Sequence, residues 1–432
     1  MLSLLSSSYA NENVLFKLGF SLLLLSPLAL MLGIAPFDMA ISLIGVLFLI
    51  QSAIKQDFAW LRATWVKIFF VLWLYMIIRG FFTIDPFLSV TQSLIFIRFA
   101  ILALALQHWL LKKSSARELF VVAIILSLIF TIADGLIQLF TSDDLLGHHI
   151  AEVDFQNPWR LTAMSGKMNI GAKTMMMAIP AIAYLVLVFQ KSSSKWLSYT
   201  AFILAIIFII FVPLTGERNA SLMMALGMVL LFFMYKPYRK SLLVLAPCVL
   251  VSLALIMHFS PGFKTRYVST IGVSSHFANI DEAPQAAIPY AALFITDKNI
   301  FLKNMIFGVG RKQYNKYCEQ MSEDLAVTKK YISQCITNAQ NIYFEWLDET
   351  GLVGTILFLA MIFIWLRQFY IQRSAFLMSG IVMGALIEIL LRLWPLASTS
   401  SFFFSWNGGP FWIMLGWVMA YLQEKHSLSI RT

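Results

Sequence analysis

Arg218 is placed where a phosphate group can be bound. It follows Gly216 and Glu217 at the start of a long apolar segment. If that segment is a helix, its N-terminus presents unpaired N–H groups and the positive end of the helix dipole. Arginine suits phosphate because its planar guanidinium bonds two oxygens at once. Arg160 and Arg266 lie near the ends of neighbouring apolar segments, so we expect the three arginines to bind a lipid-linked phosphate or diphosphate. The alternative is that they anchor the chain among lipid headgroups.

Four charged residues fall inside apolar segments, where each costs about 2.5–3.5 kcal/mol or more at mid-membrane depth. They are Arg98, Asp134, Glu388 and Arg392. Glu388 and Arg392 are four residues apart on one helical face, so we expect them to pair. We expect Arg98 and Asp134 to neutralise one another across adjacent helices. A functional role inside the membrane is the alternative for all four.

The composition is that of a membrane protein, with 59% hydrophobic and only 12% charged residues. A membrane-spanning helix needs about 20 mostly apolar residues. We predict twelve such segments, at residues 15–34, 36–53, 66–84, 90–111, 118–141, 169–189, 196–214, 218–235, 241–258, 350–366, 375–395 and 402–422. The predicted fold is therefore all-α, a single polytopic transmembrane domain over residues 1–432.

The basic residues predict the orientation of these spans. If twelve spans alternate, the short loops rich in Lys and Arg all fall on one side, whereas the loop 83–89 contains Asp85 and no basic residue. Basic loops face the cytoplasm. Both termini are therefore predicted to be cytoplasmic, with loops 142–168 and 259–349 on the outer side. This pattern accounts for the net charge of +10 without a nucleic-acid partner. The basic residues are Lys55, Arg62, Lys67, Lys112, Lys113, Arg117, Lys191, Lys195, Lys236, Arg239, Lys240, Arg367, Arg373, Lys425 and Arg431.

The outer loop 259–349, inserted between predicted spans nine and ten, is the largest polar region. Residues 288–306 are apolar with interspersed charges, which predicts an amphipathic helix at the membrane surface. Residues 314–321 predict a second short helix. Cys318 and Cys335 both lie in this loop, and in an oxidising compartment they can form a disulfide; two unpaired thiols are the alternative. The sequence has no metal-ligand spacing, so we expect neither a metal site nor a cofactor.

Four segments in order resemble motifs of the O-antigen ligase family, within the wider superfamily of O-antigen ligases and polymerases. Residues 160–180 resemble the stretch that enters a central span, and residues 215–220 resemble the arginine-containing start of a helix. Residues 306–310 resemble a Gly-x-Gly turn in the outer loop. Residues 340–354 resemble the signature His-Asn-x-x-Leu-x-x-x-x-Glu-x-Gly-x-x-Gly. By motif, the resemblance covers residues from about 160 to 358.

Members of that family are metal-independent membrane glycosyltransferases. The resemblance implies transfer of a glycan from an undecaprenyl-diphosphate carrier to a lipid A-core acceptor, at the periplasmic face of the bacterial inner membrane. The implied partners are the lipid-linked oligosaccharide or polysaccharide donor, the acceptor and membrane lipids. The implied role of Arg218 is to hold the diphosphate leaving group. Arg160, Arg266 and Asn341 are expected to bind substrate.

Two positions depart from the family pattern. Gln340 stands where the family has a histidine that assists the acceptor hydroxyl, and an amide is not a general base. Gln285 stands where the family often has a second loop arginine. Two interpretations stay open. In the first, Arg218 stabilises the diphosphate leaving group, which supplies much of the catalysis, and Gln340 orients the acceptor. In the second, the chain is a divergent or inactive member.

Other functions are also compatible with the sequence. Within the same superfamily these are a polymerase that extends a lipid-linked repeat and an oligosaccharyltransferase that acts on protein. A transporter or flippase is the alternative from another class. It predicts a continuous cavity lined by the intramembrane charges, but it does not explain the long outer loop. The sequence also lacks the internal repeats that many transporters carry.

Overall fold

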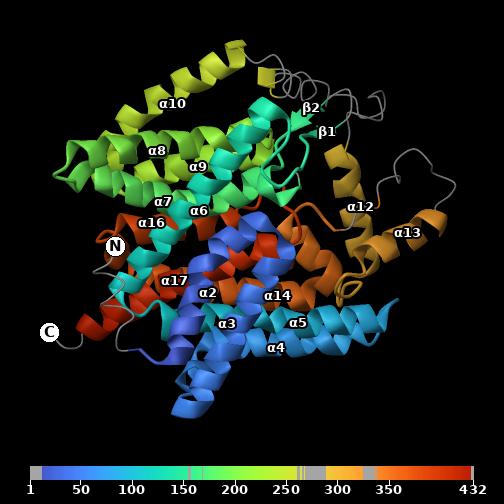
Figure 1. Cartoon of the computed structure of the whole chain (residues 1–432). Helices are drawn as coiled ribbons and strands as arrows, with labels where there is room; N and C mark the ends of the chain where they lie inside the picture. The colour runs from blue at the N-terminus through green and yellow to red at the C-terminus, as the bar shows by residue number, and fades with distance from the viewer. Residues whose placement is uncertain are drawn as a thin grey trace.

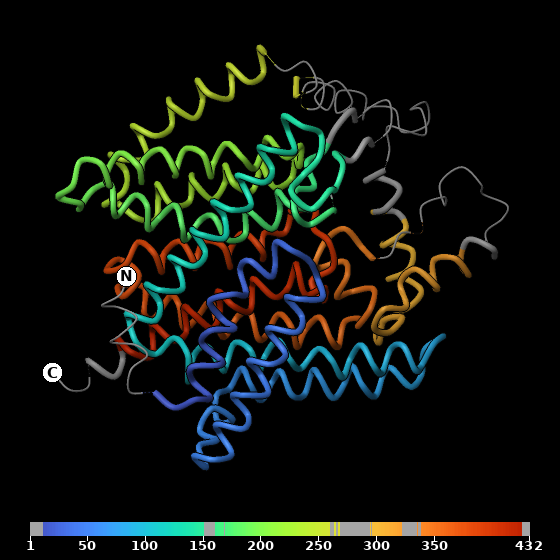
Figure 2. Tube along the Cα trace, viewed as in Figure 1, coloured from blue at the N-terminus to red at the C-terminus, as the bar shows by residue number. Residues whose placement is uncertain are grey.

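The computed structural model describes residues 12–153, 157–167, 169–259, 263–264, 267, 289–324, 335 and 338–429. Long helices, many of them side by side, make up most of these residues (Figures 1 and 2). In the first half of the chain they are α2 (Val14–Leu32), α3 (Ile34–Lys55), α4 (Thr64–Gly80), α5 (Pro86–Ala105), α6 (Ser114–Thr141), α7 (Ile170–Lys191) and α8 (Lys195–Leu214). The later helices are α9 (Arg218–Met234), α10 (Arg239–Phe259), α12 (Pro289–Lys303), α13 (Tyr314–Asp324), α14 (Ile342–Ile371), α15 (Arg373–Phe376), α16 (Gly380–Arg392) and α17 (Ser405–Ser429). Short turns of other helix types are η1 (Ala59–Arg62), η2 (Leu106–Leu110), η3 (Ala163–Ser165) and η4 (Lys236–Tyr238).

Each of the twelve predicted apolar segments contains a helix. Eight of the described helices are long and apolar enough to cross a membrane, namely α2, α3, α5 with η2, α6, α7, α8, η4 with α10, and α14. The helix α9, with 17 residues, is a shorter apolar one. The chain is therefore a multi-pass membrane protein, and the number of twelve crossings stays a prediction.

Short polar side chains determine where several helices begin. The backbone N–H groups of first turns are accepted by the side chains of Asn13 for α2, Asp85 for α5, Ser194 for α8, Asn341 for α14 and Ser379 for α16. These groups have no partner within their own helix, so each cap satisfies a donor that would otherwise lack one.

The fold departs from the prediction in two places. Helix α14 begins at Ile342, whereas the sequence predicts a loop up to residue 349. The acidic residues Glu345, Asp348 and Glu349 make this stretch look like a loop, but all three are buried against other parts of the chain. The second departure is a pair of short antiparallel strands, β1 (Ala151–Val153) and β2 (Asn157–Arg160), in a fold that is otherwise helical.

The connections between helices gather at two opposite ends. One end holds the start of α2 and the connections α3–α4, α5–α6, α7–α8 and α9–α10 (Figure 1). These connections contain predicted cytoplasmic basic residues such as Arg62, Lys112 and Lys236. The other end joins segments that are far apart in sequence. There Asp85, before α5, binds Gln313 (3.0 Å), and Asn219 of α9 binds Ser398 (2.6 Å). We call this second end the signature end, because it contains residues 340–354.

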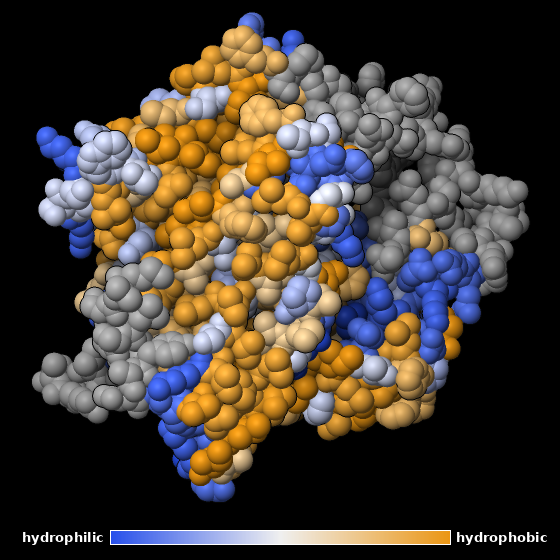
Figure 3. Space-filling view, viewed as in Figure 1, coloured by the Kyte–Doolittle hydropathy of each residue, from blue (hydrophilic) through white to orange (hydrophobic). Residues whose placement is uncertain are grey.

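The outer surface of the helices is largely apolar. Figure 3 shows hydrophobic residues over most of the visible face, with hydrophilic residues gathered toward the ends of the helices. Large apolar side chains such as Leu18, Phe233 and Leu250 are exposed. Helix α10 is the least packed of the eight candidate spans, with 17% of its apolar window buried. Such a surface suits contact with lipid rather than with water.

The charges inside the apolar segments are partnered, although not all as predicted. Arg392 and Glu388 pair within α16 at 3.4 Å, which confirms that prediction. Arg98 pairs with Asp38 of α3 at 3.2 Å, so the predicted pair of Arg98 and Asp134 is wrong. The physical reason is that α5 packs mainly against α3, α4 and α17 rather than against α6. Asp134 instead accepts a backbone N–H from the segment after α6, at 2.9 Å.

Candidate functional site at the signature end

The Gly-x-Gly turn and the signature segment meet backbone to backbone. Gly351 kinks α14 with φ 63° and ψ −167°, a conformation that only glycine adopts readily. Gly308 also has a positive φ, of 69°. A Cβ on Gly351 would lie 2.4 Å from the carbonyl oxygen of Ile306, and a Cβ on Gly308 would lie 2.5 Å from the nitrogen of Gly351. The two glycines therefore let the segments approach more closely than any other residue would.

Hydrogen bonds fix this junction to a membrane helix. Four backbone hydrogen bonds of 2.8–3.2 Å join residues 305–310 to residues 348–353. From α4, the Tyr75 hydroxyl donates to the carbonyl of Thr350 at 2.7 Å, and Arg79 donates to the carbonyl of Gly308 at 2.7 Å. Residues 305–310 are thus held to both α4 and α14.

Buried charges continue the same unit toward α17. Arg311 and Glu349 form an ion pair in which both side chains are buried. The Arg311 guanidinium also lies 3.5 Å from the ring centroid of Phe403. One turn earlier on α14, Glu345 accepts the backbone N–H of Phe402 at 2.8 Å. A buried charge is costly unless it is paired, so these contacts compensate for the burial of Glu345 and Glu349.

The segment between α16 and α17 links the two parts of the predicted site. The side-chain amide of Asn219, next to Arg218, donates to the carbonyl of Ser398 at 2.6 Å. The following residue, Thr399, donates its backbone N–H to the carbonyl of Gln340 at 2.7 Å. A single peptide unit therefore separates the side chain of Asn219 from the backbone of Gln340. The start of α9 and the backbone of Gln340 thus contact the same short segment, although they are far apart in the sequence.

Asn341 positions this segment. Its side-chain oxygen caps α14 by accepting the N–H groups of Tyr343 (2.9 Å) and Phe344 (3.4 Å). Its side-chain nitrogen donates to the carbonyls of Pro395 (2.7 Å) and Ala397 (3.3 Å). These bonds use both acceptor positions and both donor positions of the amide. We therefore interpret Asn341 as a positioning residue, whereas a substrate contact is expected from the sequence.

Glu217 occupies the start of α7, where the first N–H groups of the helix have no partner within the helix. Its two carboxylate oxygens accept the N–H groups of Gly171 (2.8 Å) and Ala172 (3.1 Å). Burial raises the pKa of Glu217 to about 7, although the nearby Arg160 favours the charged form. The chain supplies its own anion at this helix start. The start of α9, which the sequence predicts as an anion site, stays a candidate for a ligand.

Three cations accompany Glu217. Arg160 at the end of β2 and Lys173 in the first turn of α7 both act on it electrostatically. Lys173 is buried and donates to the hydroxyl of Ser165 at 2.7 Å. Arg218 follows Glu217 directly and is half-buried. The charges of Arg160 and Lys173 outnumber the one carboxylate of Glu217, so this region is net positive, which suits a phosphate group.

An apolar groove begins one helical turn from Arg218. It has a volume of about 640 Å³ and is lined by α8, α9 and α10. At one place in its lining, the hydroxyl groups of Ser221 and Tyr267 lie 2.9 Å apart, and Tyr267 also binds the carbonyl of Pro213. Most of the remaining lining is aliphatic, Met or Phe, and Phe233 in that lining is exposed at the surface. The groove therefore suits a hydrocarbon chain that enters from the surrounding lipid.

The predicted site residues fall into three groups. Gln340 and Asn219, the residue after Arg218, bind one segment, which Asn341 holds in place. Arg160 lies apart from them in sequence, beside Glu217. Arg266 lies outside the described residues, as does Gln285.

The predicted disulfide between Cys318 and Cys335 is present. Cys318 of α13 and Cys335 form a disulfide with a Cα–Cα distance of 5.6 Å. Together with Tyr314, whose hydroxyl binds Asp297 of α12, it belongs to a small core outside the main helices. Burial raises the pKa of the Asp297 carboxyl to about 6.

Three positions that organise the site are missing from the sequence-based prediction, namely Asn219, Arg311 and Glu345. One signal was available, because Glu345 and Glu349 are four residues apart and share a helical face. No sequence signal shows that the backbone of residues 395–399 joins Asn219 to Gln340. Every residue type provides a backbone carbonyl, and every type except proline provides an N–H.

The arrangement offers cations and hydrogen-bonding groups to a ligand. The Gln340 side chain is half-buried, and it makes no hydrogen bond with the described part of the chain. It can therefore accept a hydrogen bond from an incoming hydroxyl or donate one to it. Across the described ranges, no three or more His, Cys, Asp and Glu side chains are grouped so that they could hold a metal ion.

Comparison with known proteins agrees with the resemblance described above. Residues 203–359 match the family model described as O-antigen ligase. The match runs from α8 through the kink of α14, so it includes Arg218, Gln340 and both glycines of the junction, but not Arg160. No curated protein matches the sequence.

Proposed function

We propose that this chain is a membrane glycosyltransferase that transfers a glycan from undecaprenyl diphosphate to a lipid A-core acceptor. The observation that carries the proposal is the link between Asn219, Ser398, Thr399 and Gln340, because it brings the start of α9 next to the signature segment. The family match over residues 203–359 supports the general class of lipid-linked glycan chemistry.

The donor is assigned to the α9 side of the site. Its diphosphate binds Arg218, with Arg160 and Lys173 adding positive charge nearby. Its polyprenyl chain lies in the apolar groove between α8, α9 and α10, which begins one turn from Arg218. A donor with an anionic headgroup and a long apolar tail matches α9, whose start is positively charged and whose next turn borders the apolar groove. Arg266, near the end of α10 in the sequence, stays a candidate for the same role.

The acceptor is assigned to the Gln340 side. During transfer, the bond between the sugar and the diphosphate breaks, and a bond forms between the sugar and the acceptor oxygen. The diphosphate leaves with negative charge, which Arg218 stabilises, and stabilisation of this kind is often the largest part of catalysis. Gln340 holds the acceptor hydroxyl, whose proton passes to the departing diphosphate or to water.

The reaction is assigned to the periplasmic face of the inner membrane, with both termini cytoplasmic. The basic residues at the end opposite to the signature end support this orientation. The disulfide between Cys318 and Cys335 supports it independently, because disulfides persist in oxidising compartments such as the periplasm. The pairing of Arg98 with Asp38 and of Arg392 with Glu388 counts against a transporter.

A deletion strain tests the proposed reaction. Cells without the protein are expected to accumulate long glycan on the lipid carrier and to lack glycan on lipid A-core. Plasmid-borne wild type is expected to restore the attached glycan. Single unpolymerised repeats on the carrier would instead assign the chain as a polymerase. Unchanged glycan on both lipids would contradict either assignment.

A further inference from the structure

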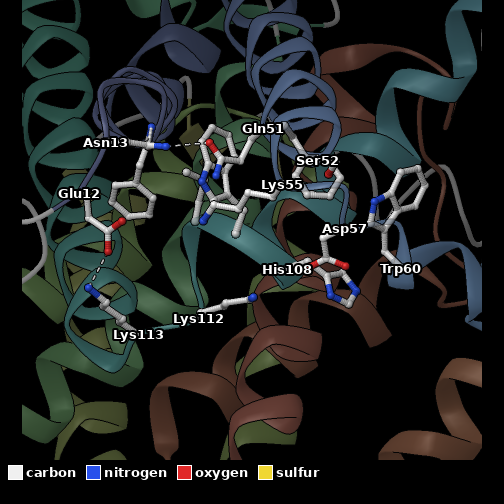
Figure 4. A pocket seen from close by; sticks show the side chains of 14 residues that line it. Glu12, Asn13, Gln51, Ser52, Lys55, Asp57, Trp60, His108, Lys112 and Lys113 are labelled. Atoms are coloured by element: carbon white, nitrogen blue, oxygen red, sulfur yellow. Dashed lines mark hydrogen bonds and ion pairs between the residues drawn. The ribbon is translucent and has the colours of Figure 1, made fainter.

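A second pocket lies at the end of the helices opposite to the signature end. It has a volume of about 230 Å³ and lies between the start of α2, the end of α3 and the turn η2 (Figure 4). Helix α5 with η2 spans 25 residues and separates it from Asp85 at the signature end by roughly 35 Å. The pocket is therefore distinct from the proposed transfer site.

Buried hydrogen-bond donors line this pocket without a partner. Gln51 is 4% exposed, and its Nε2 has no hydrogen-bond partner among the described residues, although its oxygen accepts from Asn13 at 2.9 Å. Trp60 is 7% exposed, and its Nε1 is likewise unpartnered within the described part of the chain. Nε2 of His108 is also unpartnered there, and it is a donor or an acceptor depending on the tautomer. Because an unpaired buried donor costs about 1–3 kcal/mol, the donors of Gln51 and Trp60 beside one cavity point to a ligand with acceptor atoms.

The charge in the pocket favours an anion. Lys113 is paired with Glu12 at 2.7 Å. Lys55 and Lys112 also line the pocket, and neither forms an ion pair within the described residues. Figure 4 shows the Lys112 side chain extending toward His108, beside Asp57. Two cations against the single carboxylate of Asp57 leave a net positive charge.

The backbone also has an unusual form at this place. His108 lies on η2, a turn of π-helix in which the N–H of Leu111 binds the carbonyl of Leu106 at 3.0 Å. Turns of π-helix are rare, and they occur frequently at functional sites. The π turn sets the position of His108 and of Trp109 in the pocket wall.

We propose that this pocket binds a phosphate group. Phosphate provides both the negative charge and the several acceptor oxygens that Lys55, Lys112, Gln51 and Trp60 require. The volume is below the roughly 300 Å³ at which pockets for larger ligands begin, so it fits a phosphate or a lipid headgroup rather than a nucleotide. The proposal does not depend on the transferase reaction, and the phosphate can come from an anionic phospholipid or from solution.

The test uses the full-length protein in detergent, titrated with phosphatidylglycerol or with sodium phosphate, with the melting temperature as readout. Gln51→Glu keeps the acceptor for Asn13 but replaces the unpartnered donor with a carboxylate oxygen. Lys55→Gln with Lys112→Gln removes the two cations at exposed positions. Both variants are expected to raise the half-saturating ligand concentration at least tenfold. The matched control is Lys191→Gln with Lys195→Gln, which removes two exposed cations at the same end but outside the pocket. Its half-saturating ligand concentration is expected to stay within twofold of the wild-type value.

The two titrations separate the possible sources of the phosphate. If the variants weaken the response to phosphatidylglycerol alone, the ligand is a phospholipid. If they weaken the response to sodium phosphate, the ligand is soluble phosphate. Either result supports the proposal that the pocket binds a phosphate group. If Gln51→Glu does not fold, the double lysine variant decides. Equal half-saturating concentrations in wild type, double lysine variant and control would overturn the proposal, and so would the lack of any saturable response.

Discussion

Replacing Gly351 with alanine tests whether the signature glycines are needed for the backbone junction. At φ 63° and ψ −167°, an alanine is strained by about 1–3 kcal/mol. Its Cβ would also lie 2.4 Å from the carbonyl oxygen of Ile306 and 2.5 Å from the nitrogen of Gly308, both of them backbone atoms that cannot swing away. Relieving such overpacking costs a further 1–3 kcal/mol or so. We expect Gly351→Ala to lower the free energy of unfolding by about 3 kcal/mol.

The assay is thermal unfolding of the purified protein in detergent, where a loss of this size corresponds to a fall of roughly 3 °C in Tm for a chain of this length. Gly33→Ala is the matched control. Gly33 joins α2 to α3 in an extended conformation with φ 164°, and the nearest atom to an added Cβ is 3.8 Å away. The control is expected to melt like wild type. If Gly351→Ala also melted like Gly33→Ala, the junction would not need glycine and the reasoning would be refuted.

Three further predictions follow from the site and the outer loop. The pKa of Glu217 is raised from 4.5 in the unfolded chain to about 7 in the folded protein, so the folded state binds the proton more tightly. The stability that this proton contributes is fully present below pH 4.5 and is lost as the pH rises through 7. Glu217→Gln should therefore gain stability relative to wild type between pH 5 and pH 8, on the order of 3 kcal/mol; a difference in Tm that does not vary with pH would contradict this. Cys318→Ser with Cys335→Ser should lower the stability by about 3 kcal/mol, and a reductant should lower the Tm of wild type but not of the variant; a wild-type Tm that is unchanged once its thiols are free would contradict it. Because Asn219 and Asn341 hold the same segment, the double Asn→Ala variant should lose about 1 kcal/mol less stability than the sum of the two single variants; simple additivity would show that the two asparagines act separately.

The sequence was sufficient to predict the helices, because a run of apolar residues long enough to cross a membrane also forms a helix there. It was misleading where burial depends on distant partners. The acidic start of α14 resembles a loop until Arg311 and the backbone of Phe402 are placed against it.

The pairing of the intramembrane charges shows the same limit. Glu388 and Arg392 are neighbours on one helix, so their spacing alone predicts the pair. For Arg98 the partner depends on which helices are adjacent, and the order of helices along the chain does not determine that. Hence Asp38 of α3, rather than Asp134 of α6, neutralises it.

The sequence predicted one part of the candidate site, Arg218, but not the contacts that join the start of α9 to the signature segment. The helix dipole and the chemistry of arginine single out Arg218 from the sequence. The link through residues 395–399 depends on backbone groups, and these carry no sequence signal. The role of Asn341 as a cap and a loop anchor became visible only with its four hydrogen bonds.

Glycan transfer by the purified protein tests the central claim most directly, namely that the start of α9 and the signature segment form one site. The measurement compares wild type, Arg218→Ala and Arg373→Ala, using undecaprenyl-diphosphate-linked glycan and lipid A-core. Arg373 is an exposed arginine at the opposite end of the helices and serves as the control. The account predicts a loss of about 100-fold or more for Arg218→Ala, comparable to the removal of a group that stabilises transition-state charge, and no loss for the control. Wild-type transfer by folded Arg218→Ala would contradict it.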